Sequence, residues 1–106
     1  MPVIVLHPRA EAQIVDVLNY TLEEFGEAKY LEYRDLIGLA LRTLEMTPTK
    51  GKRRPEIHPD AWTYHIARPG HRARHLFLYR IRDAVEVARF LYDAMDLPRQ
   101  RPREWK

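Results

Sequence analysis

The stretch His75-Leu76-Phe77-Leu78-Tyr79-Arg80-Ile81 decides the fold, because its centre, Leu76 to Tyr79, is an unbroken run of large apolar residues. Successive side chains of a strand point to opposite faces of a sheet, so such a run predicts a central strand that is covered on both sides. Arg82 and Asp83 then predict a turn, and the Val-, Ala- and Phe-rich segment from Ala84 to Leu91 predicts a last strand. We therefore expect the central strand to have a neighbour on each side.

The preceding segment supplies the other neighbour. Trp62, Tyr64 and Ile66 alternate with more polar residues, which is the period of a half-buried strand. The sequence Arg68-Pro69-Gly70-His71 predicts the turn that follows, since Pro and Gly suit the central positions of a tight turn. The second half of the chain therefore predicts a three-strand antiparallel meander.

Upstream of residue 47 the period changes to that of helices. Ile14, Leu18, Leu22 and Phe25 are spaced by four, four and three residues, which predicts a helix from Pro8 or Arg9 to Phe25. Gly26 then predicts a C-terminal cap. A second apolar stripe repeats the period over 27–46, and its members are Tyr30, Tyr33, Ile37, Ala40, Leu41 and Leu44. So short a connection predicts an antiparallel helical hairpin.

The remaining segments complete an α+β prediction. Val3 to Leu6 is a short apolar run before His7-Pro8 and predicts an N-terminal strand, whereas Thr47 to Pro55 predicts an exposed basic loop. Residues 96–106 are expected to form an irregular basic tail. The expected architecture is a single two-layer domain over residues 1–106: an N-terminal strand, the helical hairpin and the meander.

Composition narrows the class of protein. The 106 residues suffice for one core, and the absence of cysteine excludes disulfides, thiolate metal sites and cysteine nucleophiles, so we expect a cytoplasmic protein. The longest early apolar run, Val3 to Leu6, is far too short to span a bilayer. Residues 1–47 hold 4 basic and 8 acidic residues, whereas 48–106 hold 14 and 7, giving net charges of −4 and +7. The basic half predicts a negatively charged partner, either nucleic acid or an acidic protein segment.

The order of these elements and several local motifs are similar to those of the ParE toxins of the RelE/ParE superfamily. The motifs are Asn19-Tyr20 through Glu24-Phe25-Gly26, Ala28, Tyr33, Leu44, Pro48, Gly51-Lys52-Arg53, His75 to Ile81, Val85 to Leu91 and Met95-Asp96. The resemblance implies the toxin of a type II toxin-antitoxin system that takes part in plasmid stabilisation. It also implies a ParD-like antitoxin that forms a hetero-oligomer with the toxin and wraps it with its C-terminal segment.

The resemblance leaves two targets open. ParE-like toxins inhibit DNA gyrase by binding, which stops replication and arrests growth, whereas RelE-like relatives cleave ribosome-bound mRNA. RNA cleavage needs an acid, a base and cations for the phosphate. The candidates for that role are His65, His75, Tyr79 and Arg80. The superfamily's ribonucleases usually place a further His or Tyr near the C-terminus, and 97–106 contain neither. We therefore favour gyrase, although Tyr92 stands where many ParE sequences have a histidine.

Cationic residues and a tryptophan are the candidates for partner binding. They are Arg72, Arg74, Arg80, Arg82, Arg99, Arg101 and Trp105, and the tryptophan is expected to be an exposed anchor. His71 and His75 have the spacing of helical zinc ligands but fall on a predicted hairpin, so we expect neither metal nor cofactor. We also expect no membrane contact and no sequence-specific DNA binding. The third hypothesis is a nontoxic basic nucleic-acid-binding domain, whose affinity would fall steeply with salt.

Overall fold

The computed structural model describes residues 3–68 and 71–106, with the side chains of 68 and 71–73 left out. In chain order the elements are β1 (Ile4–Leu6), α1 (Pro8–Phe25), α2 (Glu27–Met46), the 3-10 helix η1 (Pro48–Lys50), β2 (Lys52–Arg53), β3 (Trp62–Arg68), β4 (His71–Ile81), β5 (Val85–Tyr92) and the 3-10 helix η2 (Leu97–Gln100). Within the described residues, no helix is long and apolar enough to cross a membrane.

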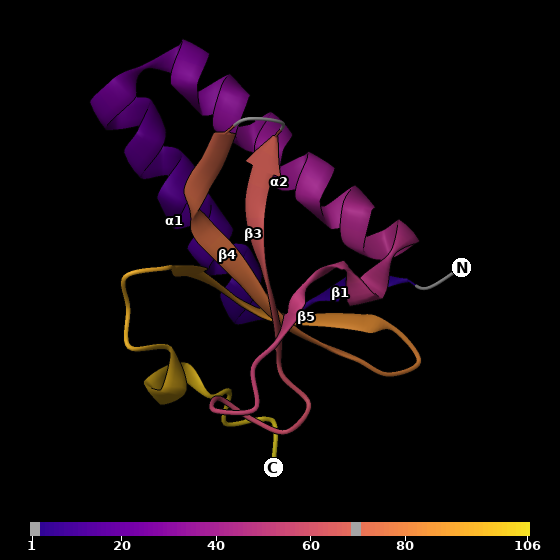
Figure 1. Cartoon of the computed structure of the whole chain (residues 1–106). Helices are drawn as coiled ribbons and strands as arrows, with labels where there is room; N and C mark the ends of the chain where they lie inside the picture. The colour runs from indigo at the N-terminus through magenta and orange to yellow at the C-terminus, as the bar shows by residue number, and fades with distance from the viewer. Residues whose placement is uncertain (1–2, 69–70) are drawn as a thin grey trace.

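The strands form one mixed sheet in the order β1-β5-β4-β3-β2 (Figure 1). β1 runs parallel to β5, and the other neighbouring strands are antiparallel. The predicted α+β class, the meander and the central position of β4 are confirmed. β3 and β4 stay paired up to Arg68 and His71. The turn predicted there falls on Pro69 and Gly70, which lie outside the described residues.

The segment 47–55 differs from the predicted loop. It contains η1 and the two-residue strand β2, which pairs with the start of β3. Gly51 makes this close approach possible, because a Cβ atom at that position would collide with the Tyr79 hydroxyl and the Thr63 carbonyl. A strand of two residues is too short to show any period in the sequence, so periodicity does not reveal it.

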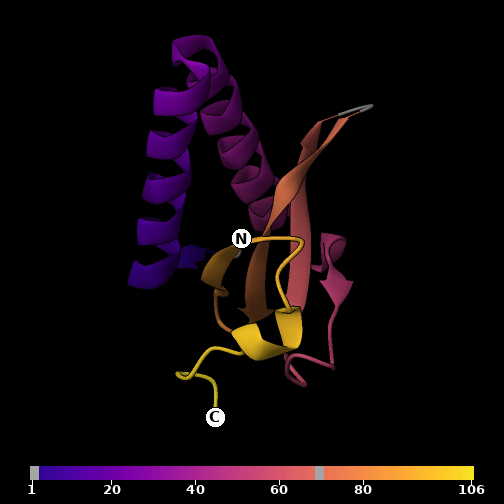
Figure 2. The same cartoon turned by 90° about the vertical axis from the view of Figure 1, so that its left-hand side faces the viewer.

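The helical hairpin is confirmed with the bounds that the sequence predicts, and it lies on one side of the sheet (Figure 2). Pro8 occupies the first turn of α1, and the His7 Nδ1 atom caps the helix by accepting a hydrogen bond of 3.1 Å from the Arg9 N–H. Gly26 separates the helices with φ of 88°, a left-handed value that favours glycine. Local sequence therefore determines both ends of α1.

Two apolar clusters cover the two faces of the sheet. The cluster beneath the helices includes Leu44, Ile66, Phe77 and Tyr79, all of which are fully buried or nearly so. The second cluster, on the opposite face, includes Ile57, Ala61, Leu76, Leu78, Leu91 and Trp105. The segment 57–61 and the C-terminal residues cover this second face, where the fold has no long helix (Figure 2). β4 is thus apolar on both faces because both are covered.

The prediction of an exposed Trp105 anchor is wrong, and the tail, which is irregular beyond η2 as expected, is packed against the sheet. Trp105 is only 3% exposed, contacts the His58 ring edge-on at 5.5 Å and lies beneath the Arg80 guanidinium, whose Cζ is 5.1 Å from the ring centroid. The neighbouring Glu104 carboxylate accepts hydrogen bonds of 2.8 and 3.0 Å from the nearly buried guanidinium of Arg89. The tail is therefore held onto the sheet by an ion pair and a buried ring, and Trp105 has little surface left for a partner.

Candidate functional site

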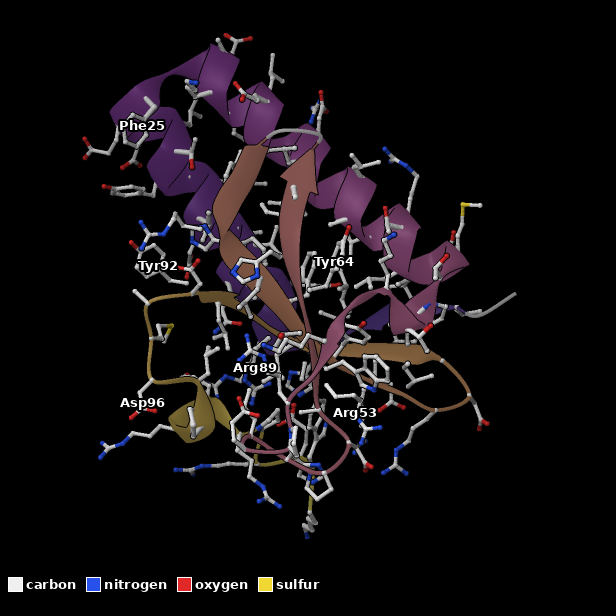
Figure 3. All side chains as sticks on the ribbon, viewed as in Figure 1. Phe25, Arg53, Tyr64, Arg89, Tyr92 and Asp96 are labelled. Atoms are coloured by element: carbon white, nitrogen blue, oxygen red, sulfur yellow. The ribbon has the colours of Figure 1, made fainter. Side chains whose placement is uncertain are left out.

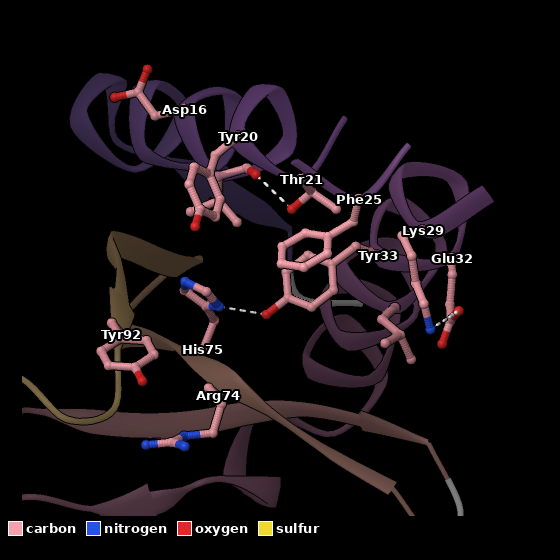
Figure 4. A pocket seen from close by; sticks show the side chains of 12 residues that line it. Asp16, Tyr20, Thr21, Phe25, Lys29, Glu32, Tyr33, Arg74, His75 and Tyr92 are labelled. Carbon is pink, nitrogen blue, oxygen red and sulfur yellow. Dashed lines mark hydrogen bonds and ion pairs between the residues drawn. The ribbon is translucent and has the colours of Figure 1, made fainter. Parts of the chain in front are cut away.

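A groove of about 780 Å³ lies between the helical hairpin and the sheet, where β4 begins and β5 ends. Its lining residues are Asp16, Val17, Tyr20, Thr21, Phe25, Lys29, Glu32, Tyr33, Leu36, Arg74, His75 and Tyr92 (Figure 4). Apolar and aromatic side chains dominate this lining, and charged groups stand among them. An apolar concavity with a few polar groups is the usual form of a binding site.

The groove is open because the distal part of α1 lies beyond the end of β5. Tyr20 and Phe25 remain 59% and 63% exposed, although their rings contact each other edge-on with centroids 6.2 Å apart. Leu22 and Phe25, which the helical period placed in the buried stripe, are thus both exposed. Periodicity correctly predicts the apolar face of α1, but the sheet covers only the part of that face that includes Ile14 and Leu18.

His75 is on the helix-facing side of β4 and is surrounded by aromatic rings. It stacks on Phe90 with a centroid distance of 5.2 Å and meets Tyr33 and Tyr92 edge-on, each at 5.6 Å. Its Nδ1 atom is hydrogen-bonded to the Tyr33 hydroxyl (Figure 4). Burial lowers the pKa of His75, while the Asp93 carboxylate opposes that effect. Burial, with a contribution from Asp93, raises the pKa of Tyr33 to about 12.

Asp93, which follows β5 directly, organises the polar groups at this end of the sheet. Its two carboxylate oxygens accept hydrogen bonds from His65 Nε2 at 3.2 Å and from Arg74 Nε at 3.1 Å. Partial burial raises the pKa of Asp93, but these two hydrogen bonds outweigh burial and hold the pKa below its usual value. Sequence reasoning missed this residue. The feature that could have revealed Asp93 is the antiparallel register of β4 and β5: once His75 pairs with Tyr92, Asp93 lies beside Arg74.

The four residues that a ribonuclease would use do not form one site. His75 and Tyr79 point toward the helices, whereas His65 and Arg80 belong to the opposite face, where they meet Asp93 and Trp105 respectively. Tyr79 is also fully buried: its hydroxyl donates to the Pro48 carbonyl at 2.7 Å and accepts from the Gly51 N–H at 3.2 Å. Burial raises the pKa of Tyr79 to about 12. The sheet itself therefore separates the candidate acid and base groups.

The structure places most of the predicted partner-binding cations in ion pairs. Arg74 pairs with Asp93, Arg80 with Glu86 at 2.6 Å, Arg82 with Asp60 at 3.4 Å and Arg99 with Asp96 at 3.2 Å. Only Arg80 is largely buried among these, and the others keep more than half of their side-chain surface. Arg101 is exposed, and the side chain of Arg72 lies outside the described residues. Of this set, only Arg74 lines the groove.

The described residues contain no cluster of three or more potential metal ligands from His, Cys, Asp and Glu. His75 is one of the two histidines with zinc-like spacing, and its Nδ1 atom is hydrogen-bonded to the Tyr33 hydroxyl. The side chain of the other, His71, lies outside the described residues.

Comparison with known proteins gives two findings. A family model described as the ParE toxin of the type II toxin-antitoxin system parDE matches residues 4–97. A solved structure from P. aeruginosa, titled as its chromosomal ParDE toxin-antitoxin system, is similar in fold, with a TM-score of 0.71 and 17% sequence identity over 87% of this chain and 96% of that chain. No curated protein sequence matches the chain.

Proposed function

Since the chain belongs to the ParE toxin family of type II toxin-antitoxin systems, we propose that it inhibits DNA gyrase and that a ParD-like antitoxin neutralises it. This activity would stop replication and arrest growth in the cytoplasm, where gyrase acts. The function requires binding surfaces and no catalytic residues of the toxin's own. The family match carries the toxin assignment, and the arrangement of side chains supports gyrase over the ribosome.

The observation that favours gyrase is the separation of the candidate catalytic groups. A ribonuclease needs its base, its acid and its phosphate-binding cation around one phosphodiester. Here His75 and His65 are on opposite faces of the sheet, and the Tyr79 hydroxyl is committed to two backbone groups. A phenol with a pKa of about 12 is also a poor base near neutral pH. General acid-base cleavage of RNA is therefore poorly supported.

The antitoxin is proposed to occupy the groove beside the helical hairpin. The aromatic side chains of Tyr20 and Phe25 are exposed at its edge, and such rings are typical anchors of protein interfaces. Charged groups of both signs line the groove: Lys29 is paired with Glu32, Arg74 is paired with Asp93, and Asp16 is part of the lining as well. The occupant that fits is an amphipathic segment with an apolar stripe flanked by charged residues. A helix that lays its apolar face into such a groove is a common mode of peptide recognition.

Purified gyrase provides the test of the toxic function. Increasing amounts of the chain are added to a supercoiling reaction, and cleaved DNA is measured in parallel after protein denaturation. We expect supercoiling to fall and gyrase-dependent cleaved DNA to accumulate. Pulse-labelling after induction in bacteria should show DNA synthesis stopping before protein synthesis. Intact supercoiling at excess toxin, or protein synthesis stopping first, would count against gyrase.

Two exposed positions of α1 test the groove. Tyr20→Asp puts a charge in the lining, whereas Val15→Asp puts the same charge at a position that is 53% exposed and is not part of the lining. Both residues are exposed, so neither change removes a core side chain. We expect Tyr20→Asp to weaken antitoxin binding at least tenfold, measured by calorimetry, while Val15→Asp leaves it unchanged. Equal affinities of the two variants would place the antitoxin elsewhere.

A further inference from the structure

The polar centre of the groove is the His75 ring, which is rigidly held. Phe90 lies flat against it with an interplanar angle of 15°, and Tyr33 and Tyr92 close two sides with their ring edges. The groups that act on it are the Tyr33 hydroxyl of α2 and the Asp93 carboxylate that follows β5, with the neighbouring Arg74 of β4 paired to that carboxylate. A ring packed in this way presents its nitrogen atoms in fixed directions.

The hydrogen bond to Tyr33 couples the proton of the His75 ring to the direction in which the Tyr33 hydroxyl donates. With a pKa of about 12, Tyr33 stays a phenol at neutral pH and has a proton to donate. Burial lowers the pKa of His75, so its ring is neutral under the same conditions and carries one proton. If Tyr33 donates to Nδ1, that proton lies on Nε2, because the partner of one ring nitrogen sets the state of the other.

The Nε2 atom is directed away from Tyr33 and toward the groove (Figure 4). None of the hydrogen bonds and ion pairs found among the described residues uses it. Among the described residues, no buried side-chain nitrogen or oxygen lacks a hydrogen-bond partner. Since Nε2 has no such partner, it is not buried, and His75 lines the groove. While the groove is open, water can accept a hydrogen bond from an N–H group in its lining. Once a bound partner excludes that water, the N–H group needs an acceptor on the partner, because a buried donor without one is destabilising.

We propose that His75 determines the specificity of the groove by donating its Nε2–H to a carboxylate oxygen on the docked antitoxin segment. This inference rests on the proposed function, since the antitoxin is the occupant. The acceptor is assigned as an Asp or Glu side chain because Arg74 lines the same groove, with its guanidinium over the Tyr92 ring, 5.2 Å from the centroid, and Tyr92 in turn meets His75 edge-on. Arg74 uses its Nε–H for Asp93, and its remaining N–H groups favour a further carboxylate at this point of the groove. A segment that places an apolar side chain next to Nε2 leaves this donor without an acceptor and therefore binds more weakly.

His75→Phe is the central variant of the test, because it keeps a flat aromatic ring and removes the donor. The probe is a fluorescein-labelled peptide of the antitoxin's C-terminal segment, and its dissociation constant is measured by anisotropy at pH 7. We expect His75→Phe to weaken binding by about tenfold to a hundredfold, because the lost hydrogen bond is to a charged group. His75→Gln, which retains an N–H donor, should recover part of the loss, and Val15→Ala outside the groove should have no effect. Thermal melting of each variant shows whether it is folded.

The acceptor is located by replacing each acidic residue of the peptide with its amide or alanine counterpart. One replacement should weaken binding to the wild-type chain and have little further effect with His75→Phe, as a double-mutant cycle requires for a direct contact. Affinity of His75→Phe equal to wild type, or additive losses at every acidic position, would overturn the inference while leaving the proposed function standing. Failure of the wild-type chain to bind the peptide would overturn both the inference and the placement of the antitoxin in the groove.

A second measurement, the protonation state of His75, needs neither the antitoxin nor any variant of the chain. In the free wild-type chain labelled with ¹⁵N, the histidine ring shifts report which nitrogen is protonated. We expect the His75 proton on Nε2 at pH 7. A proton on Nδ1 would make Tyr33 the acceptor and leave Nε2 without a hydrogen to donate, and the inference would be wrong.

Discussion

The ion pair between Arg89, labelled in Figure 3, and Glu104 should be essential for holding the C-terminal tail on the sheet. Glu104→Gln keeps the size of the side chain and removes its charge. Arg89 is only 5% exposed, so it would lose its carboxylate partner while remaining out of water. Removing one partner of a fully buried pair costs about 3–5 kcal/mol, whereas exposed pairs contribute about 1 kcal/mol or less. Glu104 is 31% exposed, and the new amide oxygen still accepts one hydrogen bond, so we expect a loss of about 2 kcal/mol.

Urea unfolding at pH 7, followed by circular dichroism, measures this loss directly. In a domain of this size a change of about 2 kcal/mol corresponds to a decrease in melting temperature of roughly 10 °C. Glu23→Gln, at an exposed position near the end of α1, is the matched control and should change stability by less than about 0.5 kcal/mol. A Glu104→Gln variant as stable as the control would refute the argument that the tail is held by this pair.

The pH dependence provides a second check of the same pair. The hydrogen bonds from Arg89 are the main cause that lowers the pKa of Glu104 from its ordinary value of 4.5. A lowered carboxyl pKa contributes stability that is complete above the unfolded-state value and is lost as the pH falls through the folded-state value. The stability difference between wild type and Glu104→Gln should therefore be constant near neutrality and shrink below about pH 4.5. A difference that does not change with pH would exclude the charge as its origin.

Three further substitutions test the packing by urea unfolding. Trp105→Ala should destabilise the fold by about 3 kcal/mol, because the ring is buried in the second apolar cluster. A change in stability close to zero would contradict the burial of this ring. Gly51→Ala should cost about 2 kcal/mol, since its methyl group meets the Tyr79 hydroxyl and the Thr63 carbonyl. Gly38→Ala is its counterpart within α2: the added methyl meets only the flexible end of an arginine side chain at 3.4 Å, so this change should stabilise the helix by about 0.5–1 kcal/mol. Equal effects of the two glycine substitutions would contradict the role assigned to Gly51.

Local sequence was sufficient to predict the main elements because their signals are local. The cap at His7, the proline after it and Gly26 mark both ends of α1, and the apolar centre of β4 requires cover on both faces. The second half of the chain likewise shows the period of strands. The family resemblance, now confirmed by the match over residues 4–97, depends on the order of these same elements.

The tail and the groove could not be predicted in this way, since they depend on contacts between distant residues. Nothing near Glu104 indicates that Arg89 is its partner, and without that pair an arginine-rich end resembles a solvated tail. The groove depends on how the end of α1 is placed relative to the sheet, and Phe25 is exposed there although its spacing is that of a core residue. Assigning Trp105 to an interface failed for the same reason, because its burial depends on His58 and Arg80.

The face covered by the tail and the exposed edge of the groove should respond differently to substitution. On one face the tail covers the apolar residues and holds Trp105 and the Arg89–Glu104 pair, so substitutions there should first lower the free energy of unfolding. On the other face the helices leave a groove whose exposed members, such as Tyr20, contribute little to the core. Substitutions at these positions should change antitoxin affinity at nearly constant stability. Under the proposed function, the groove can therefore adapt to an antitoxin without unfolding the domain.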